Sequence, residues 1–350
     1  MDGPERSADV AATPPPLRPD RIFDIGWAFC KSKVLFSAVE LGLFTELGGE
    51  SLDLATLTKR LGLHERGAQD FFDALVSLKL LERDTQGRYF NRPDCALYLD
   101  RRSPSYLGGK LEFLDARLYP IWALLTKALR TGEPQTELGI GGYASLYADQ
   151  SALDGFVKGM SGGSLLPALE LARIFPWESY RTVIDIGTAQ GRVPVEIARA
   201  HPHLGGGGFD LPQVEPAFMS FVREHGMEQR LRFYAGDFLK DELPRADVLI
   251  MGRILHNWDL PTRLMLLQKA HRALPAGGAL IVYDALIDRA RRSDARALLA
   301  SLNMLIETAG GFEYTAAQCI GWMHDSGFDK MRVAPLDGRE SAVIGVKAGA

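Results

Sequence analysis

The sequence predicts a two-part chain: a mainly helical N-terminal part, and a C-terminal α/β domain built on a mostly parallel, doubly wound sheet. Three observations support this prediction. At 350 residues the chain is longer than one average domain. From position 181 onward, short apolar runs alternate with helical segments, which is typical of a parallel sheet covered on both faces. Before position 176, apolar residues recur mainly at helical spacing.

Residues 20–105 are expected to form the first domain. They follow a tail, residues 1–19, that contains three consecutive prolines and lacks the apolar core of a signal peptide. Apolar spacing predicts two helices over 21–47, a helix ending at Leu61, a turn at Gly62, and another helix to about Leu81. A hairpin is predicted through 84–90. Helix, turn, helix and a two-stranded wing are the outline of a winged helix.

Residues 106–175 are predicted to be a helical connector, interrupted by Gly139, Gly141 and Gly142. Residues 176–350 then form the α/β domain, with strands predicted at 182–186, 207–211, 231–234, 247–251 and 279–283. Two further strands, at 331–335 and 341–346, have no helix between them. They are therefore expected to pair as a terminal antiparallel hairpin.

The bulk composition is that of an ordinary globular protein. A formal net charge of -4 gives no electrostatic reason to bind nucleic acid or an anionic membrane. No apolar run approaches the roughly 20 residues of a membrane span. The cysteines, Cys30, Cys95 and Cys319, are far apart and lack CxxC spacing, which predicts neither disulfides nor a zinc site. We expect a cytoplasmic protein with no metal, nucleic-acid or membrane partner.

A glycine-containing loop follows the first strand of the α/β domain. Asp185 ends the strand, and Gly187 and Gly191 bracket the loop before an apolar helix. Ligands bind at this edge of doubly wound sheets, where glycines let the backbone approach them. Asp210 ends the next strand, where a carboxylate can accept both ribose hydroxyls, and Asp237 follows the third strand. The GxxxG spacing disfavours an NAD-linked oxidoreductase and suits a ligand with adenine, ribose and a charged amino-acid tail.

A histidine lies at the expected end of the fourth strand, in the run Leu255-His256-Asn257-Trp258-Asp259. A phenol with a pKa near 10 is ionised to only about one part in a thousand at pH 7. An imidazole with a pKa near 6.5 is suited to removing that proton. Such a base needs its other nitrogen held, and Glu313, after Gly310-Gly311, is the candidate acceptor. From the residues alone, a purely structural histidine stays an alternative.

These motifs together resemble those of the plant and bacterial small-molecule O-methyltransferases, a group with caffeate, flavonoid and antibiotic-tailoring enzymes. The resemblance covers nearly the whole chain after the tail. The motifs that carry it are Asp185-Ile186-Gly187-Thr188-Ala189-Gln190-Gly191, Phe209-Asp210-Leu211-Pro212-Gln213-Val214, Gly236-Asp237-Phe238, Leu255-His256-Asn257-Trp258 and Gly310-Gly311-Phe312-Glu313.

The resemblance implies a Rossmann-like class I methyltransferase sheet, a winged-helix dimerisation domain that forms a homodimer, and a connector that lines the substrate pocket. It also implies S-adenosyl-L-methionine (SAM) as cofactor and S-adenosyl-L-homocysteine as product. The implied reaction is methylation of a hydroxyl on a small aromatic secondary metabolite, phenolic or polycyclic.

Carried over residue by residue, the resemblance assigns His256 as general base, Glu313 as the carboxylate that orients it, and Asp284 as a second acid. The residues that it implies for the cofactor are Asp185, Gly187, Gly191, Asp210, Leu211, Asp237, Phe238, Arg253 and Ser161. Those that it implies for the substrate are Phe156, Met160, Asn257, Asn303 and Met304. Asn257 departs from the plant enzymes, which usually have Asp at this position.

Other functions stay open at this point. Carbon or nitrogen methylation uses the same in-line attack on the methyl group, and some bacterial relatives keep the fold and the cofactor but perform other chemistry, including hydroxylation. A winged helix can also belong to a DNA-binding regulator. Glu65, Asp70 and Asp73 on the second winged-helix helix disfavour that function, because their charge opposes the phosphates of a DNA groove.

Overall fold

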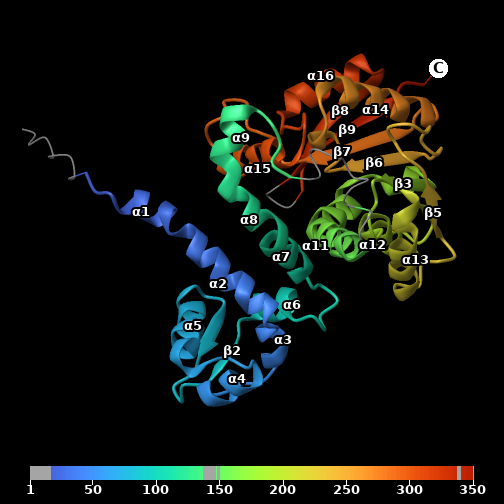
Figure 1. Cartoon of the computed structure of the whole chain (residues 1–350). Helices are drawn as coiled ribbons and strands as arrows, with labels where there is room; N and C mark the ends of the chain where they lie inside the picture. The colour runs from blue at the N-terminus through green and yellow to red at the C-terminus, as the bar shows by residue number, and fades with distance from the viewer. Residues whose placement is uncertain (1–16, 137–146, 148–149, 337–339, 350) are drawn as a thin grey trace, which may run out of the picture.

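The computed structural model of the chain describes residues 17–136, 147, 150–336 and 340–349. A small, mainly helical N-terminal domain and a larger α/β domain lie on either side of a run of helices (Figure 1). The three glycines that were predicted to interrupt the connector lie outside the described residues.

The N-terminal domain has the predicted winged-helix outline. Its elements are α1 (Asp20–Gly26), α2 (Ala28–Glu40), α3 (Leu43–Leu47), α4 (Leu54–Arg60), α5 (Glu65–Ser77), β1 (Leu81–Arg83), β2 (Tyr89–Asn91) and α6 (Pro93–Leu99). The prediction of two helices over 21–47 was wrong, because the chain breaks at Trp27 and again at Gly42, whose φ of 70° separates α2 from α3. Helix α5 ends earlier than predicted, and Lys79 turns the chain at a φ of 58°. The predicted hairpin is confirmed as the antiparallel pair β1 and β2.

Apolar side chains remain exposed at the start of this domain, where α1 extends away from the rest of the chain (Figure 1). Each of five is more than half exposed: Ile22, Phe23, Ile25, Trp27 and Phe29. The helices of the described residues include none with the length and apolar character that a membrane crossing requires. The three cysteines are free thiols, as predicted.

The connector is a series of short helices that ends in one long helix. Its described elements are α7 (Gly108–Phe113), the π-helical turn η1 (Leu114–Leu118), α8 (Tyr119–Ile121), the 3-10 turn η2 (Trp122–Leu124), α9 (Leu125–Thr131) and α11 (Gln150–Ile174). Helix α11 packs against both α7 and the first helix of the α/β domain, α12 (Arg192–Ala200). It therefore joins the connector to the sheet.

The α/β domain is a seven-stranded sheet with helices on both faces. Its strands are β3 (Thr182–Ile186), β4 (Gly205–Asp210), β5 (Leu231–Ala235), β6 (Val248–Gly252), β7 (Ala279–Asp284), β8 (Phe328–Pro335) and β9 (Ser341–Lys347). Its further helices and 3-10 turns are η3 (Trp177–Ser179), η4 (Pro212–Val214), α13 (Glu215–Glu224), η5 (Leu255–Asn257), α14 (Leu260–Ala273), α15 (Ala295–Glu307) and α16 (Ala316–Asp325).

The strand order is β5-β4-β3-β6-β7-β9-β8, and the first five strands are parallel. Strand β9 runs antiparallel to β7 and to β8, which confirms the predicted terminal hairpin. Neighbouring residues Val183 and Ile184 of β3 point to opposite faces, and both are buried in apolar clusters. This is the burial expected of a parallel sheet between two helical layers.

Strand β4 begins two residues earlier than predicted, inside the glycine run 205–208. Gly206 and Gly207 have φ angles of 138° and 155°. A Cβ added at Gly206 would lie 1.9 Å from the carbonyl oxygen of Val183, and one at Gly207 would lie 1.8 Å from that of Arg232. These positions therefore require glycine. From the sequence alone, a run of glycines indicates a turn and not a central strand.

Candidate active site

A cavity of about 1200 Å³ opens at the carboxyl ends of the parallel strands. This is larger than the roughly 300–1,000 Å³ of a typical pocket for one small ligand, so it has room for a cofactor and a substrate together. Most residues that the sequence assigned to the site line it: Asp185, Gly187, Asp210, Leu211, Asp237, Phe238, Arg253, Ser161, Phe156, Met160, His256, Asn257, Asn303, Met304 and Glu313. Gly191 and Asp284 do not line it.

The end of β4 holds an acid by backbone hydrogen bonds. The two carboxylate oxygens of Asp210 accept the N–H groups of Ala189, at 2.9 Å, and of Leu211, at 2.8 Å. Burial raises the pKa of Asp210 to about 6, although these N–H groups oppose the shift. Burial also raises the pKa of Asp185 to about 8. Two buried acids at adjacent strand ends suit a ligand that brings hydroxyl groups and positive charge.

The loop after β3 takes the shape that its glycines allow. Gly187 has a φ of 73°, and Ala189 has a φ of 51°, so an alanine occupies a left-handed conformation in this loop. Gly191, with a φ of 86°, begins α12, and a Cβ there would lie 2.5 Å from the ring of Phe218. Gly191 therefore serves close packing behind the loop, and its contact with a cofactor stays a prediction.

Two side chains of the predicted cofactor set come from different elements. The guanidinium of Arg253 donates to Glu340, at 2.5 Å, and to the carbonyl oxygen of Gly163, at 2.6 Å, so it ties α11 to the sheet. The buried hydroxyl of Ser161 has no hydrogen-bond partner within the described part of the chain. Because buried polar groups are normally satisfied, a bound ligand is the fitting partner for this hydroxyl.

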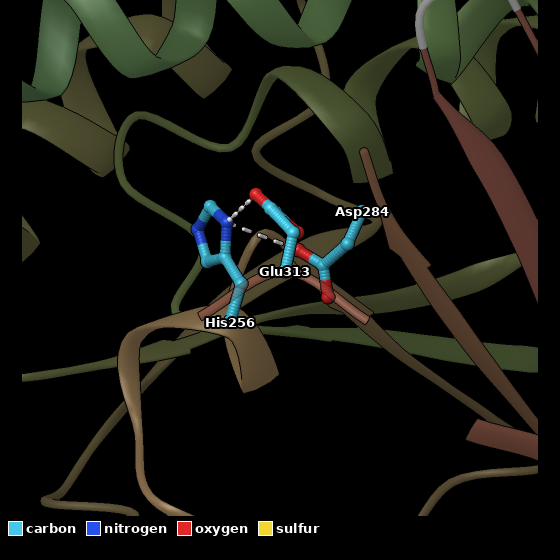
Figure 2. A group of neighbouring side chains, drawn as sticks. All are labelled: His256, Asp284 and Glu313. Atoms are coloured by element: carbon cyan, nitrogen blue, oxygen red, sulfur yellow. Dashed lines mark hydrogen bonds and ion pairs between the residues drawn. The ribbon is translucent and has the colours of Figure 1, made fainter. Parts of the chain in front are cut away.

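The structure brings three side chains together (Figure 2): His256 of η5, Asp284 at the end of β7, and Glu313 of the segment before α16. Nδ1 of His256 lies 2.7 Å from a carboxylate oxygen of Glu313, which is hydrogen-bonding distance. Asp284 lies 3.6 Å from the same nitrogen and accepts the hydroxyl of Tyr314. The other ring nitrogen, Nε2, points away from both carboxylates (Figure 2).

The two acids change the basicity of the histidine. Burial alone lowers the pKa of His256, but the negative charges of Glu313 and Asp284 outweigh it and raise the pKa to about 9. For the carboxyl group of Asp284, burial raises the pKa, and the charge of protonated His256 opposes that shift. The imidazole is therefore a stronger base than a free histidine, and more of it is protonated at neutral pH.

These three side chains are also close enough for their ligand atoms to share a metal ion, since the atoms lie within 4.8 Å of one another. An ion bound there would displace the proton between Nδ1 and Glu313. The prediction that no metal is needed therefore has a direct test, which is turnover after treatment with a chelator.

A buried arginine fixes the two segments that carry the base and its acid. The Arg263 side chain is fully buried and donates to the carbonyl oxygens of Trp258, at 2.8 Å, and Phe312, at 2.5 Å. Its guanidinium also lies 3.7 Å from the centre of the Phe312 ring. The backbone N–H of Phe312 donates to the carbonyl oxygen of His256, at 2.9 Å. Arg263 was not predicted, because a lone arginine on α14 has no sequence signal that separates it from a solvated one.

The opposite wall is formed by side chains of the connector and α15. The indole N–H of Trp122 donates to Asn303, at 3.0 Å, and the Asn303 amide donates to Glu307, at 2.8 Å. Glu307 pairs with Arg117 at 3.0 Å. Met304, one residue past Asn303, is buried at the cavity wall. Arg117 and the cavity-lining Lys110 were also missed, although the glycines beside Lys110 at 108 and 109 indicate close helix packing.

Family models match two parts of the chain: an O-methyltransferase dimerisation domain over residues 24–101 and an O-methyltransferase domain over residues 122–329. Among curated relatives, the tetracenomycin polyketide synthesis 8-O-methyl transferase TcmO of Streptomyces glaucescens is 45% identical, over 94% of this chain and 97% of its own. The N,N-dimethyltransferase OxyT of Streptomyces rimosus is 41% identical, over 75% of this chain and 77% of its own.

A solved structure extends the likeness to the whole fold. Human N-acetylserotonin methyltransferase in complex with SAM superposes with a TM-score of 0.86 at 26% identity, covering 96% of this chain and all of that one. The family matches overturn the alternatives of an NAD-linked oxidoreductase and a DNA-binding regulator. They confirm the predicted fold class and enzyme class. The chain thus belongs to the O-methyltransferase family, as a SAM-dependent enzyme with an N-terminal dimerisation domain.

Proposed function

We propose that the enzyme methylates a phenolic hydroxyl of a small polycyclic aromatic molecule, with His256 as general base. The observation that carries this proposal is the 2.7 Å contact between Nδ1 of His256 and Glu313. In the neutral imidazole, that hydrogen bond selects the tautomer with a proton on Nδ1 and leaves the lone pair of Nε2 free at the cavity. His256 is then placed to accept a proton from a substrate hydroxyl.

Bound SAM supplies a methyl group on a sulfonium, which is already an activated leaving group. The residues of the chain therefore have to position the acceptor and remove its proton. When the substrate oxygen takes the methyl group, the methyl–sulfur bond would break and S-adenosyl-L-homocysteine would leave, while Nε2 of His256 accepts the proton of the hydroxyl. Glu313, still accepting the N–H of Nδ1, stabilises the imidazolium that forms. Asp284 adds negative charge behind the ring, at 3.6 Å from Nδ1.

A raised histidine pKa suits an oxygen acceptor. The pKa of about 9 for His256 lies close to the value near 10 of a phenol, so proton transfer between them is nearly balanced. An amine that attacks as its neutral form needs no base to expose its lone pair. The pairing of His256 with two acids therefore favours oxygen as the nucleophile.

The cavity supports a flat, apolar substrate. Its wall includes Phe113, Trp122, Phe156, Met160 and Met304, and the rings of Phe113 and Phe156 meet edge to face at 5.9 Å. Aromatic faces and edges of this kind pack well against fused rings. By its name, TcmO acts in synthesis of the polyketide tetracenomycin, and we infer a polycyclic phenol as the substrate class here as well.

Nitrogen methylation is the second candidate, because OxyT is named as an N,N-dimethyltransferase and is 41% identical. The two candidates differ in the product. Fragmentation by mass spectrometry places the added methyl group on oxygen or on nitrogen when the substrate offers both a phenol and an aromatic amine.

The experiment that tests the proposal is mass spectrometry on reactions with methyl-labelled SAM and a panel of phenols, hydroxynaphthoates and anthraquinones. We expect one labelled methyl on oxygen, and a roughly 10²–10⁴-fold slower turnover for His256→Ala, the usual contribution of a general base. SAM affinity should stay within about twofold in this variant. Turnover at the wild-type rate by His256→Ala would exclude its role as base. Binding of SAM without any methylated product would instead support altered chemistry, such as hydroxylation.

We also propose that the chain forms a homodimer through its N-terminal domain. The exposed apolar side chains of α1 and Trp27 are what such an interface buries. Light scattering should give twice the chain mass, and Trp27→Asp should lower it. Val333→Asp, an exposed apolar position on β8, is the matched control. A monomer in the unmodified protein would contradict the dimer.

The domain division at 1–19, 20–105, 106–175 and 176–350 is part of the same proposal. The family matches, which end at 101 and begin again at 122, agree with a boundary near 105. Limited proteolysis that cuts first near 105 and near the end of the tail would support it. The cytoplasmic location stays a prediction.

A further inference from the structure

Helix α7 places a lysine in the cavity that the proposed mechanism does not use. Two glycines of α11 let α7 approach closely: a Cβ at Gly162 would lie 3.3 Å from the backbone nitrogen of Lys110, and one at Gly159 would lie 2.7 Å from the Cβ of Phe113. With its backbone held against α11, half-buried Lys110 contributes to the cavity lining.

Lys110 differs from the other lysines and arginines at the cavity wall, because each of those pairs with an acid. Arg253 pairs with Glu340 at 2.5 Å, Arg192 with Glu196 at 3.1 Å, and Lys240 with Asp237 at 3.0 Å. Across the residues that the structure describes, no carboxylate lies within 4.0 Å of the Lys110 ammonium. The ammonium lies over the Phe113 ring, whose centre is 4.9 Å away.

The unpaired ammonium carries an energetic cost. Burial, and then the positive charge of Arg253, lower the pKa of Lys110 to about 8, while the negative charges of Glu307 and Glu340 oppose the shift. Partial burial of a charge is unfavourable when no acid pairs with it, as is the case for half-buried Lys110 among the described residues. An anionic oxygen bound beside Lys110 would remove this cost and would be held by a charge-assisted hydrogen bond.

The position of the ammonium indicates which ligand brings that oxygen. Lys110 lies over Phe113, and Phe113 meets Phe156, so the charge lies beside the aromatic wall. A flat substrate packed on this wall presents its ring substituents to Lys110. The cofactor also has a carboxylate, and it is the competing source of the same chemistry.

We propose that Lys110 binds a carboxylate carried by the aromatic substrate, so that the enzyme prefers hydroxylated aromatic acids to their neutral counterparts. This inference rests on the proposed function, because it assumes that the aromatic wall holds the methyl acceptor. Lys110 acts as a specificity determinant and takes no part in proton transfer.

The test compares a hydroxynaphthoate with its methyl ester, which differ in charge and hardly in shape. Binding is measured by quenching of tryptophan fluorescence without SAM, and kcat/KM is measured with labelled SAM. For Lys110→Met we expect roughly a ten- to hundredfold loss of affinity and of kcat/KM for the acid, the size of a charged hydrogen bond, with changes within about twofold for the ester. Lys110→Arg should keep the preference for the acid. Lys158→Met, an exposed lysine on α11, is the matched control.

Three outcomes would overturn the inference. Equal losses for acid and ester would assign Lys110 to packing alone. A loss of SAM affinity in Lys110→Met, measured by calorimetry, with unchanged affinity for the acid would assign the charge to the cofactor carboxylate. No preference for the acid in the unmodified enzyme would remove the need for a counterion. Loss of acid binding in Lys110→Met without any methylated product would support the inference while contradicting the proposed function.

Discussion

The two halves of the cavity are built in different ways. The cofactor half lies at the ends of neighbouring strands of one sheet, and its central acid, Asp210, is held by two backbone N–H groups. The substrate half is assembled from α7, η2, α11 and α15, and its polar groups are held by other side chains, as in the contact of Trp122 with Asn303. Recognition in the first half therefore follows from the backbone of the fold, whereas recognition in the second depends on side chains that single substitutions can change.

Among the variants that test this difference between the two halves, Asp210→Ala should have the largest effect. The variant loses the proposed acceptor for the ribose hydroxyls and leaves the N–H groups of Ala189 and Leu211 without their partner. We expect SAM to bind roughly a hundredfold more weakly, as for the loss of a buried, charged hydrogen-bond acceptor. Calorimetry measures the SAM affinity, and fluorescence quenching measures that of the aromatic ligand.

The Asp210→Asn variant is the control, because it keeps one acceptor oxygen and should lose less affinity. If Asp210→Ala weakened the aromatic ligand as much as SAM, the two halves would not be separate recognition sites.

The next effect concerns Glu313, at the junction of the halves. Because a raised pKa keeps His256 protonated to higher pH, kcat/KM should increase with pH up to about 9 in the unmodified enzyme. Glu313→Gln still accepts the N–H of Nδ1 but removes a negative charge that raises the pKa. The rising limb should therefore move to lower pH by about one to three units. The plateau should fall about tenfold, because the base is weaker.

The measurement is kcat/KM as a function of pH for the unmodified enzyme and for Glu313→Gln, with the same phenol as substrate. The ionisation of the substrate is then common to both profiles. An unchanged limb in Glu313→Gln would mean that a group other than His256 titrates.

The smallest expected effect is that of Trp122→Phe. This variant keeps an aromatic surface but removes the N–H that Asn303 accepts, so the loss is about that of one neutral hydrogen bond, roughly fivefold in KM for the aromatic substrate. SAM affinity should not change. Combining it with Asn303→Ala should give less than the sum of the two effects, because both variants break the same contact. Additive losses would show that the contact does not organise the substrate half.

The sequence predicted best what depends on local patterns. The bounds of β3 agree with the prediction, because a short run of apolar residues is typical of a parallel strand that is buried on both faces. The contact of His256 with Glu313 was also expected, since the motif Gly310-Gly311-Phe312-Glu313 resembles the one that carries the orienting carboxylate in the family. The early start of β4 was not expected, because the glycines at 205 and 206 are usual in turns. The need for glycine at 206 depends on the carbonyl oxygen of Val183 in the neighbouring strand β3.

Features set by contacts between distant segments escaped prediction. Arg263 is buried because Trp258 and Phe312 offer it carbonyl oxygens, and nothing in the spacing of α14 indicates this. Lys110 lines the cavity because α11 carries glycines some 50 positions further along the chain. In both cases the burial of the side chain depends on segments that are distant in the sequence.

The burial of Arg263 has a consequence for how products leave. Residues of α2, α7 and α11 line part of the cavity that the substrate would enter and the methylated product would leave. The base and its acid lie on the other side, in segments that Arg263 and the backbone bond between Phe312 and His256 join within the α/β domain. If α2, α7 and α11 shift as the product leaves, His256 and Glu313 would therefore keep their contact, because the segments that carry them are joined within the α/β domain.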